Sequence, residues 1–169
     1  MSDPKRYHAP KSLGRALNFA AGAGNTVCTH LLAPHGLSLA QWAVLNCLWL
    51  NGPLGVKALA ELTGNAPPAT SRLVDRMITG GLLTRRQSTE DRRAVTVDVT
   101  ERGEALRPTH EIYNSVNTVL LDGFTEAEAE ALFDQLARIE ANAAAWLDKP
   151  SSALGAGAEE QPDDETQKR

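Results

Sequence analysis

Cysteine is scarce in this sequence, with only Cys28 and Cys47 among 169 residues. Two cysteines cannot form a disulfide framework, and we expect both to be reduced. The first ten residues contain no apolar segment typical of a secretory signal, so we expect a cytoplasmic location. No apolar run approaches the roughly 20 residues of a membrane-spanning helix. A single soluble globular domain with no membrane contact is therefore expected.

An excess of positive charge is also absent, because the formal net charge is −4. The charges are nevertheless unevenly distributed along the chain. Six arginines stand against three acids from Arg72 to Arg93, a net of +3. Seven acids stand against one arginine in residues 122–148, a net of −6, and residues 151–169 carry a net of −3. The net charge argues against nucleic-acid binding by the chain as a whole, but the local charge gives one basic pole and one acidic pole.

Catalytic motifs are missing as well. The sequence has no G-x-S-x-G, no glycine-rich phosphate loop, no H-E-x-x-H and no paired carboxylates beside a histidine. We therefore expect neither an enzyme nor a bound cofactor. Residues Cys28, His30 and His35, with His110, offer ligand atoms for a metal, but residues two apart in a helix do not converge on one face. No metal site is predicted.

Four helices are expected in the first half of the chain. Apolar or small residues recur from Leu13 to Leu31 at spacings of 4, 3, 4, 3 and 4, which predicts a helix with one narrow seam that ends before Pro34. Ser38 and Gln41 form a capping box that begins a second helix. A third helix is expected over residues 55–63, with Leu59 and Leu62 inward, and a fourth over 67–78.

The third and fourth helices are joined by a short turn, as in a helix-turn-helix. Pro67 and Pro68 are compatible with the first turn of the fourth helix, where N–H groups have no partner within the helix. The i, i+4 spacing predicts that Ala69, Leu73 and Met77 form its buried face. The outer face would then carry Pro68, Ser71, Arg72, Asp75 and Arg76, a polar surface that can enter a DNA groove.

The second half begins with two strands. Residues 82–86 and the alternating residues 95–100 predict strands joined by a projecting polar loop, or wing. Thr100 is expected to cap a fifth helix that runs to about Leu121, and Thr125 with Glu128 a sixth. The sixth helix has its own seam at Ala129, Leu132, Leu136, Ile139, Ala143 and Trp146. Beyond Pro150 the polar composition predicts disorder.

The expected organisation is an irregular arm over residues 1–10, a domain over 11–147, and a disordered acidic tail over 148–169. The domain is mainly α with a small two-stranded β wing. Its winged core spans about 38–100, flanked by helices over about 11–33 and 101–147. A small domain has no obvious place to bury both terminal seams, so we expect a twofold homodimer that presents two recognition helices to a pseudo-palindrome.

Three segments resemble the MarR family of winged-helix transcription regulators: 36–45, 70–77 followed by Gly81-Leu82-Leu83, and Asp91-Arg92-Arg93 with Thr100-Glu101-Arg102-Gly103. The resemblance covers roughly residues 11–147. It implies a cytoplasmic, ligand-responsive repressor that binds double-stranded DNA as a homodimer. The fourth helix would read the major groove and the wing would enter the minor groove.

The resemblance also assigns residues. Ser71 and Arg72 would contact bases or phosphates, and Arg93 would be the wing-tip arginine. We add Pro68, Thr70, Arg76, Arg92 and one of the strand arginines, Arg86, because only one of Arg85 and Arg86 can face DNA. Asp75 is expected to pair with Arg93 or Arg92 and, with Asp91, to hold the wing against the fourth helix.

The family resemblance implies a small aromatic or phenolic effector between the dimer helices and the winged core. We assign Trp42, His110 and Tyr113 to that pocket, although aromatic residues at helical spacing usually belong to a core. Three alternatives remain: a redox sensor through Cys28, a metal sensor of the same fold, and a winged helix that binds protein. The setting of Cys28 favours inert packing, because a reactive thiol needs an electropositive, exposed environment.

Overall fold

The computed structural model describes residues 11–87 and 95–149. The chain divides into two compact units, one up to Asp122 and one from Gly123, and each is described by itself. No helix in the described ranges is long and apolar enough to cross a membrane. The predicted arm over residues 1–10, the wing tip and nearly all of the predicted tail lie outside the described residues.

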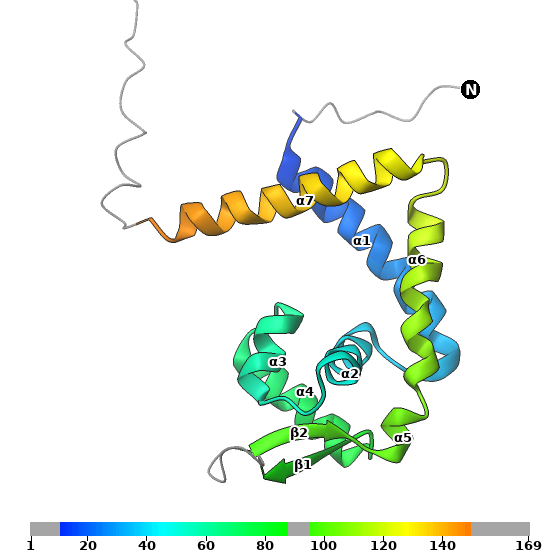
Figure 1. The fold of residues 1–169 in the computed structure, drawn as a ribbon, viewed down its shortest axis with the longest axis vertical. Helices are drawn as coiled ribbons and strands as arrows, with labels where there is room; N and C mark the ends of the chain where they lie inside the picture. Colours follow the sequence, from blue (N-terminus) through cyan, green and yellow to red (C-terminus); the bar gives the residue numbers. More distant parts are fainter. Residues whose placement is uncertain (1–10, 88–94, 150–169) are drawn as a thin grey trace, which may run out of the picture. The chain divides into compact units, whose positions relative to one another are not determined.

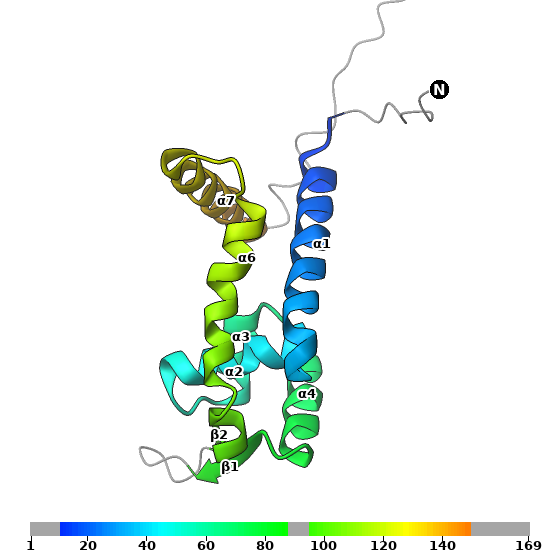
Figure 2. The same ribbon diagram turned by 90° about the vertical axis from the view of Figure 1, so that its right-hand side faces the viewer.

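Helix α1 (Leu13–Leu32) begins at Ser12, whose hydroxyl accepts a hydrogen bond from the Arg15 N–H. Its half-buried residues Leu17, Gly24, Val27 and Leu31 belong to the predicted seam. Helix α6 (Ile112–Leu120) packs against α1 (Figure 2). A Cβ at Gly24 would lie 3.3 Å from Leu120 Cδ1, so the seam lets the two helices approach closely. The 3₁₀ turn η1 (Ala33–His35) follows α1 and contains Pro34.

The winged core is built on α2 (Leu39–Asn51), α3 (Val56–Thr63) and α4 (Pro67–Thr79). The predicted capping box at α2 is confirmed, since the Ser38 hydroxyl accepts from the Gln41 N–H and the Gln41 side chain accepts from the Ser38 N–H. The fully buried side chains of these helices include Val44, Leu45, Leu59, Val74 and Met77. These aliphatic groups form the centre of the core.

Two inward assignments from the sequence are wrong. Leu62 is 56% exposed, and only Leu59 of the predicted pair is buried. On α4 the buried residues are Thr70, Leu73, Val74 and Met77, whereas Ala69 is exposed. These four positions follow the i, i+3, i+4, i+7 spacing of one helix face, because a helical turn has 3.6 residues. The true face is therefore rotated from the predicted one.

Strands β1 (Leu83–Gln87) and β2 (Val95–Val99) pair antiparallel, with Leu83 opposite Val99 and Arg86 opposite Thr96 (Figure 1). Leu54 adds an isolated bridge to Val97, with both backbone N–H groups donating across it. Leu83 and Val97 are buried on the inner face of the sheet. This face fixes the base of the wing on the helical core.

The predicted fifth helix is not continuous. Thr100 caps α5 (Glu101–Glu104) as expected, accepting from the Gly103 N–H, but α5 is followed by the 3₁₀ helix η2 (Arg107–Glu111) and then by α6. Pro108 explains the break, because it has no N–H and its ring clashes with the carbonyl four residues earlier in an α-helix. A continuous fifth helix across Pro108 was therefore a wrong prediction.

The second unit consists, in its described part, mainly of α7 (Glu126–Leu147). The predicted capping box is confirmed, and the hydrogen bonds from the Thr125 backbone and hydroxyl lower the pKa of Glu128. No residue of α7 is buried. Leu136 and Trp146 of its predicted seam are 40% and 53% exposed.

Candidate DNA-binding site

The outer face of α4 carries most of the predicted major-groove residues. Pro68, Arg72, Asp75 and Arg76 are exposed, and Ser71 is half-buried. Within the described part of the chain, neither Arg72 nor Arg76 has an ion pair or side-chain hydrogen bond. Two guanidinium groups one turn apart are therefore available to an anion. Arginine donates from a planar fork that suits phosphates and guanine edges.

Thr70 was predicted to contact DNA, and the structure contradicts this. Its side chain is 1% exposed, and its hydroxyl donates to the Ala66 carbonyl oxygen at 3.3 Å. It lies on the face of α4 that packs into the core, together with Leu73 and Met77. The rotation of the buried face described above is the cause of the error.

The N-terminus of α4 does not present backbone donors to a phosphate. Pro67 and Pro68 have no N–H, and the N–H groups of Ala69 and Thr70 both donate to the Ala66 carbonyl, at 3.0 and 3.1 Å. Helix N-termini bind phosphates through free N–H groups. Contacts from this helix must therefore come from side chains.

Asp75 is the acidic residue on this otherwise basic face. Its Oδ1 accepts a hydrogen bond from Arg85 Nη2 on β1 at 2.7 Å. Arg85 lies opposite the buried Val97 and thus on the side of the sheet that meets the helices. The pair ties β1 to α4. Arg85 was not predicted as the partner of Asp75, although the alternation from buried Leu83 places residue 85 on the same face.

Arg86 occupies the other face of the sheet. Its Nη1 lies 3.3 Å from Oδ2 of Asp98, whose side chain is 17% exposed. Asp98 also accepts from the Val99 N–H at 2.8 Å. Arg86 remains 65% exposed, so the contact orients the guanidinium without burying it. The predicted wing residues Asp91, Arg92 and Arg93 lie outside the described residues.

The turn after α4 is held by the segment that begins α5. The Thr100 hydroxyl lies 2.7 Å from the Gly81 carbonyl oxygen, and Arg102 Nη1 donates to the Gly80 carbonyl at 3.0 Å. The Thr100 N–H donates to Leu82 O at 3.1 Å. Gly81 takes a φ of +72°, which favours glycine. The end of the recognition-type helix is thereby fixed to the start of α5.

A family model, described as MarR family, matches residues 37–95, which include all of α2, α3, α4 and β1. The helix-turn-helix segment and the first strand are thus similar to the MarR family. Over 115 residues the chain is 27% identical to the uncharacterized HTH-type transcriptional regulator YwaE of Bacillus subtilis strain 168, covering 68% of this chain and 67% of that protein. The relatives are thus transcriptional regulators.

Solved MarR-type structures share the winged-helix fold. A mutant MarR from E. coli complexed with operator DNA has a TM-score of 0.69 and 22% identity, covering 75% of this chain and 92% of that one. Bordetella bronchiseptica BpsR, from a study of how 6-hydroxynicotinic acid regulates its DNA binding, has a TM-score of 0.71 and 22% identity. That likeness covers 80% of this chain and 98% of BpsR. Three helices and a two-stranded wing therefore form a MarR-type winged helix.

The aromatic residues predicted for an effector pocket lie close together beside the MarR-type core. The Trp42 and Tyr113 rings are 4.3 Å apart, and the His110 and Tyr113 rings 5.4 Å apart. Trp42 is only 4% exposed, and its Nε1 donates to the Thr109 carbonyl. Trp42 is thus a core residue, which corrects its assignment to a pocket lining. Tyr113 is 44% exposed.

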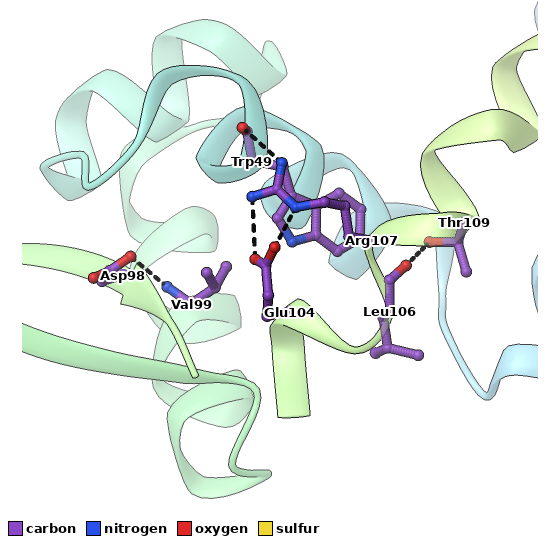
Figure 3. Close-up of polar contacts among 7 residues, drawn as sticks. All are labelled: Trp49, Asp98, Val99, Glu104, Leu106, Arg107 and Thr109. Atoms are coloured by element: carbon purple, nitrogen blue, oxygen red, sulfur yellow. Dashed lines mark hydrogen bonds and ion pairs between the residues drawn. The ribbon is translucent and has the colours of Figure 1, made fainter. Parts of the chain in front are cut away.

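A groove of about 580 Å³ lies at the last turn of α2 and the α5–η2 segment. Of the three predicted pocket residues its lining includes His110 alone. The lining residues are Trp49, Leu50, Glu104, Ala105, Arg107, Pro108, His110 and Glu111. The Arg107 guanidinium bonds both the Glu104 carboxylate and the Trp49 carbonyl (Figure 3). This groove was not predicted from the sequence, because it combines residues about 50 positions apart.

The two cysteines of this chain are in unreactive settings. Cys28 is 5% exposed, and burial raises the pKa of its thiol. Burial also raises the pKa of the Cys47 thiol. A raised pKa leaves less thiolate near neutral pH, and the thiolate is the reactive form. Among the described residues, no three His, Cys, Asp or Glu side chains are grouped so that they could hold a metal ion.

Proposed function

We propose that this chain is a sequence-specific, double-stranded-DNA-binding transcriptional regulator that acts as a homodimeric repressor and is released by a small-molecule ligand. The observation that carries the proposal is the outer face of α4. Arg72 and Arg76 are exposed there with no partner among the described residues, beside a two-stranded wing. The match of residues 37–95 to the MarR family supports it.

In this proposal Ser71, Arg72 and Arg76 contact the major groove, while Arg92 and Arg93 of the wing contact the adjacent minor groove. Arg86 reaches the backbone from the outer face of β1. Asp75 and Arg85 hold the strand against the recognition helix, so that helix and wing approach DNA in one orientation. Phosphate contacts would position the protein, and base contacts would give specificity.

A dimer accounts for the exposed apolar side chains of the terminal helices. They include Leu13 and Phe19 of α1, Val119 and Leu120 of α6, and Phe133, Leu136 and Trp146 of α7, each at least 40% exposed. Large apolar side chains exposed in such numbers are typical of an interface. A twofold dimer would place two copies of α4 on half-sites about one helical turn, roughly 34–36 Å, apart.

The proposed effector is a small aromatic or phenolic compound that binds next to His110 and Tyr113. These residues lie on η2 and α6, which lead from the winged core toward the proposed dimer helices. A ligand that binds better to a conformation with misplaced recognition helices would release DNA, since it shifts the equilibrium by its differential affinity. BpsR, whose DNA binding is regulated by 6-hydroxynicotinic acid, supports this kind of control.

The test is fluorescence anisotropy with labelled DNA from upstream of the protein's own gene, titrated at several salt concentrations. A DNA-binding dimer should lose affinity steeply with salt, because each phosphate contact releases counterions and adds about −0.9 to the log–log slope. Arg72→Ala should weaken binding by about 1–3 kcal/mol, roughly 5- to 150-fold.

Arg138→Ala is the matched control, since it removes the same charge from an exposed position on α7, outside the winged core. It should bind DNA like the unsubstituted protein. Salt-independent binding, or equal losses in the two variants, would contradict the proposal and would favour a winged helix that binds protein.

A further inference from the structure

The first turn of α4 presents an exposed surface without hydrogen-bonding side chains. Ala66, Pro67, Pro68 and Ala69 are all exposed, and none of their side chains carries a donor or an acceptor. The two prolines have no N–H, and the N–H groups of Ala69 and Thr70 both donate to the Ala66 carbonyl. The Thr70 hydroxyl donates to the same oxygen from the buried face of the helix. The outer side of this turn is therefore apolar.

This apolar surface is continuous with the basic surface of the same helix. Pro68 and Ala69 precede Arg72 by four and three residues, and residues at these spacings lie side by side on a helix. Pro67 precedes Arg72 by five residues and lies off this face. If Arg72 enters the major groove, Pro68 and Ala69 enter it as well. The N-terminal residues of a recognition helix are those that contact base edges.

The apolar turn is also held in one conformation. Proline fixes its own φ at about −65°, and two prolines occupy the first two positions of α4. In the preceding turn the Asn65 N–H donates to the Ala60 carbonyl at 3.0 Å, and the Gly64 N–H donates to the Glu61 carbonyl at 3.3 Å. A surface that is ordered before binding loses little conformational entropy on binding. Its shape can therefore contribute to the choice of base.

One group in the major groove suits such a surface. Guanine, adenine and cytosine present only donors and acceptors there, whereas thymine presents a C5-methyl group beside its acceptor. A methyl group packed on Pro68 and Ala69 exchanges contact with water for an apolar contact. A polar base edge at the same place would lose its hydrogen bonds to water and gain none from the protein. Both effects favour thymine.

We propose that Pro68 and Ala69 specify a T·A base pair in each half-site by packing on the thymine methyl group. This preference rests on the proposed DNA-binding function and adds a base identity to it. Arg72, one turn further along α4, supplies polar contacts next to the methyl group. Burial of one methyl group corresponds to about a fourfold change in affinity. Two half-sites that contribute independently give about a 15-fold change.

The test first selects the best-bound duplex from a random-sequence pool, using the full-length protein. That duplex is then synthesised with thymine, with deoxyuridine in place of every thymine, and in scrambled order with thymine. Deoxyuridine pairs as thymine does and lacks only the C5-methyl group. In anisotropy titrations the uracil duplex should bind about 15-fold more weakly than the thymine duplex. The scrambled duplex measures the non-specific affinity.

Pro68→Ser replaces the apolar ring by a hydroxyl group at an exposed position, and it should reduce the preference for thymine over uracil to below about fourfold. Pro67→Ser is the matched control, because it makes the same substitution one residue earlier, off the face shared with Arg72. It should keep a preference of about 15-fold. Ala69→Ser serves if Pro68→Ser does not fold, and it should also lower the preference.

Equal affinity of the unsubstituted protein for the thymine and uracil duplexes would overturn the proposal while leaving DNA binding in place. A preference that is unchanged in Pro68→Ser, or in Ala69→Ser where that variant is used, would do the same. A selection that enriches no sequence, or equal affinity for the selected and scrambled thymine duplexes, would overturn the proposed function and the base preference together.

Discussion

Asp75 places a negative charge on the helix face that is proposed to meet a polyanion. The side chains of Asp75 and Arg85 are 54% and 51% exposed, and their contact is 2.7 Å. A surface ion pair of this kind contributes only about 0–1 kcal/mol to stability. Its main effect is therefore to link β1 to α4. We regard Asp75 as a positioning residue for the wing.

Replacing Asp75 by Asn is expected to lower the ratio of specific to non-specific DNA affinity about 3- to 10-fold. The loss of the ion pair frees β1 and Arg85, while the loss of a negative charge raises non-specific attraction to phosphates. Anisotropy titrations against operator and scrambled DNA at one salt concentration measure both affinities. The midpoint of urea unfolding should shift by no more than the equivalent of about 1 kcal/mol.

Glu61→Gln provides the charge-matched control. Glu61 is an exposed acid on α3 that pairs with Lys57 at 3.9 Å, and its substitution removes the same charge without touching the wing. The control should raise specific and non-specific affinity by similar factors. An identical response of Asp75→Asn would show that Asp75 acts only through its charge.

At the scale of elements, the junction of α4, β1 and α5 is the most constrained part of the winged core. Gly103 is buried in α5, and a Cβ there would overlap the Leu82 carbonyl oxygen, which is backbone and cannot rotate away. The same Leu82 carbonyl accepts from the Thr100 N–H. A glycine is needed at this position because the two chain segments touch.

Gly103→Ala is therefore expected to destabilise the protein by about 1–3 kcal/mol, despite the higher helix propensity of alanine. Urea denaturation at fixed protein concentration, followed by far-UV circular dichroism, measures the change. Gly14→Ala is the matched control in α1, where a Cβ meets nothing within 4 Å. It should be neutral or slightly stabilising. Equal midpoints for the two variants would contradict the close approach at Gly103.

The N-terminus of α4 limits how this helix can bind DNA, because it has no free backbone N–H groups in its first turn. Two prolines begin the helix, and the next two N–H groups are already bonded to Ala66. An anion cannot be bound there through the backbone. Hydrogen bonds from this helix to DNA consequently depend on Ser71, Arg72 and Arg76, which all lie after its first turn.

At the scale of the whole molecule, α1 and α7 carry large apolar side chains that are exposed in the described chain. The N-terminal half of α1 is mostly exposed, and α7 has no buried residue. Winged helices read short half-sites, so two copies on one pseudo-palindrome would bind far more tightly than one. Dimerisation and DNA affinity should therefore be lost together.

Leu136→Glu is expected to shift the protein from dimer to monomer and to weaken operator binding by at least about 100-fold, the lower end of the usual gain from two linked sites. Light scattering after size exclusion gives the mass, and anisotropy gives the affinity. Gln135→Glu introduces the same charge on a neighbouring exposed position outside the seam and should remain dimeric. A Leu136→Glu dimer with intact DNA binding would place the interface elsewhere.

Much of the fold could be predicted from local sequence signals. Capping boxes at Ser38 and Thr125, glycine stops and the alternation of residues 95–99 are local rules, and the structure follows them. The break at Pro108 could also have been predicted, because a proline in a helix interior removes a backbone hydrogen bond and interrupts the helix. The orientation of α4 could not be predicted in the same way. Ala69 and Val74 are both apolar, so either could be assigned to the buried face from the sequence.

The sequence by itself determined the winged-helix order, the basic segment from Arg72 to Arg93 and the apolar seams of the first and last helices, because periodicity, caps and charge are properties of neighbouring residues. Only the tertiary structure decided that Thr70 is buried, that Arg85 is the partner of Asp75, and that Trp49 meets Arg107 and Glu104 in one groove. These are contacts between distant residues, and their geometry depends on how whole elements rotate and pack. Helical periodicity predicts the buried face of a helix only to within about one residue. The packing of the whole helix against the core then decides which residue is buried.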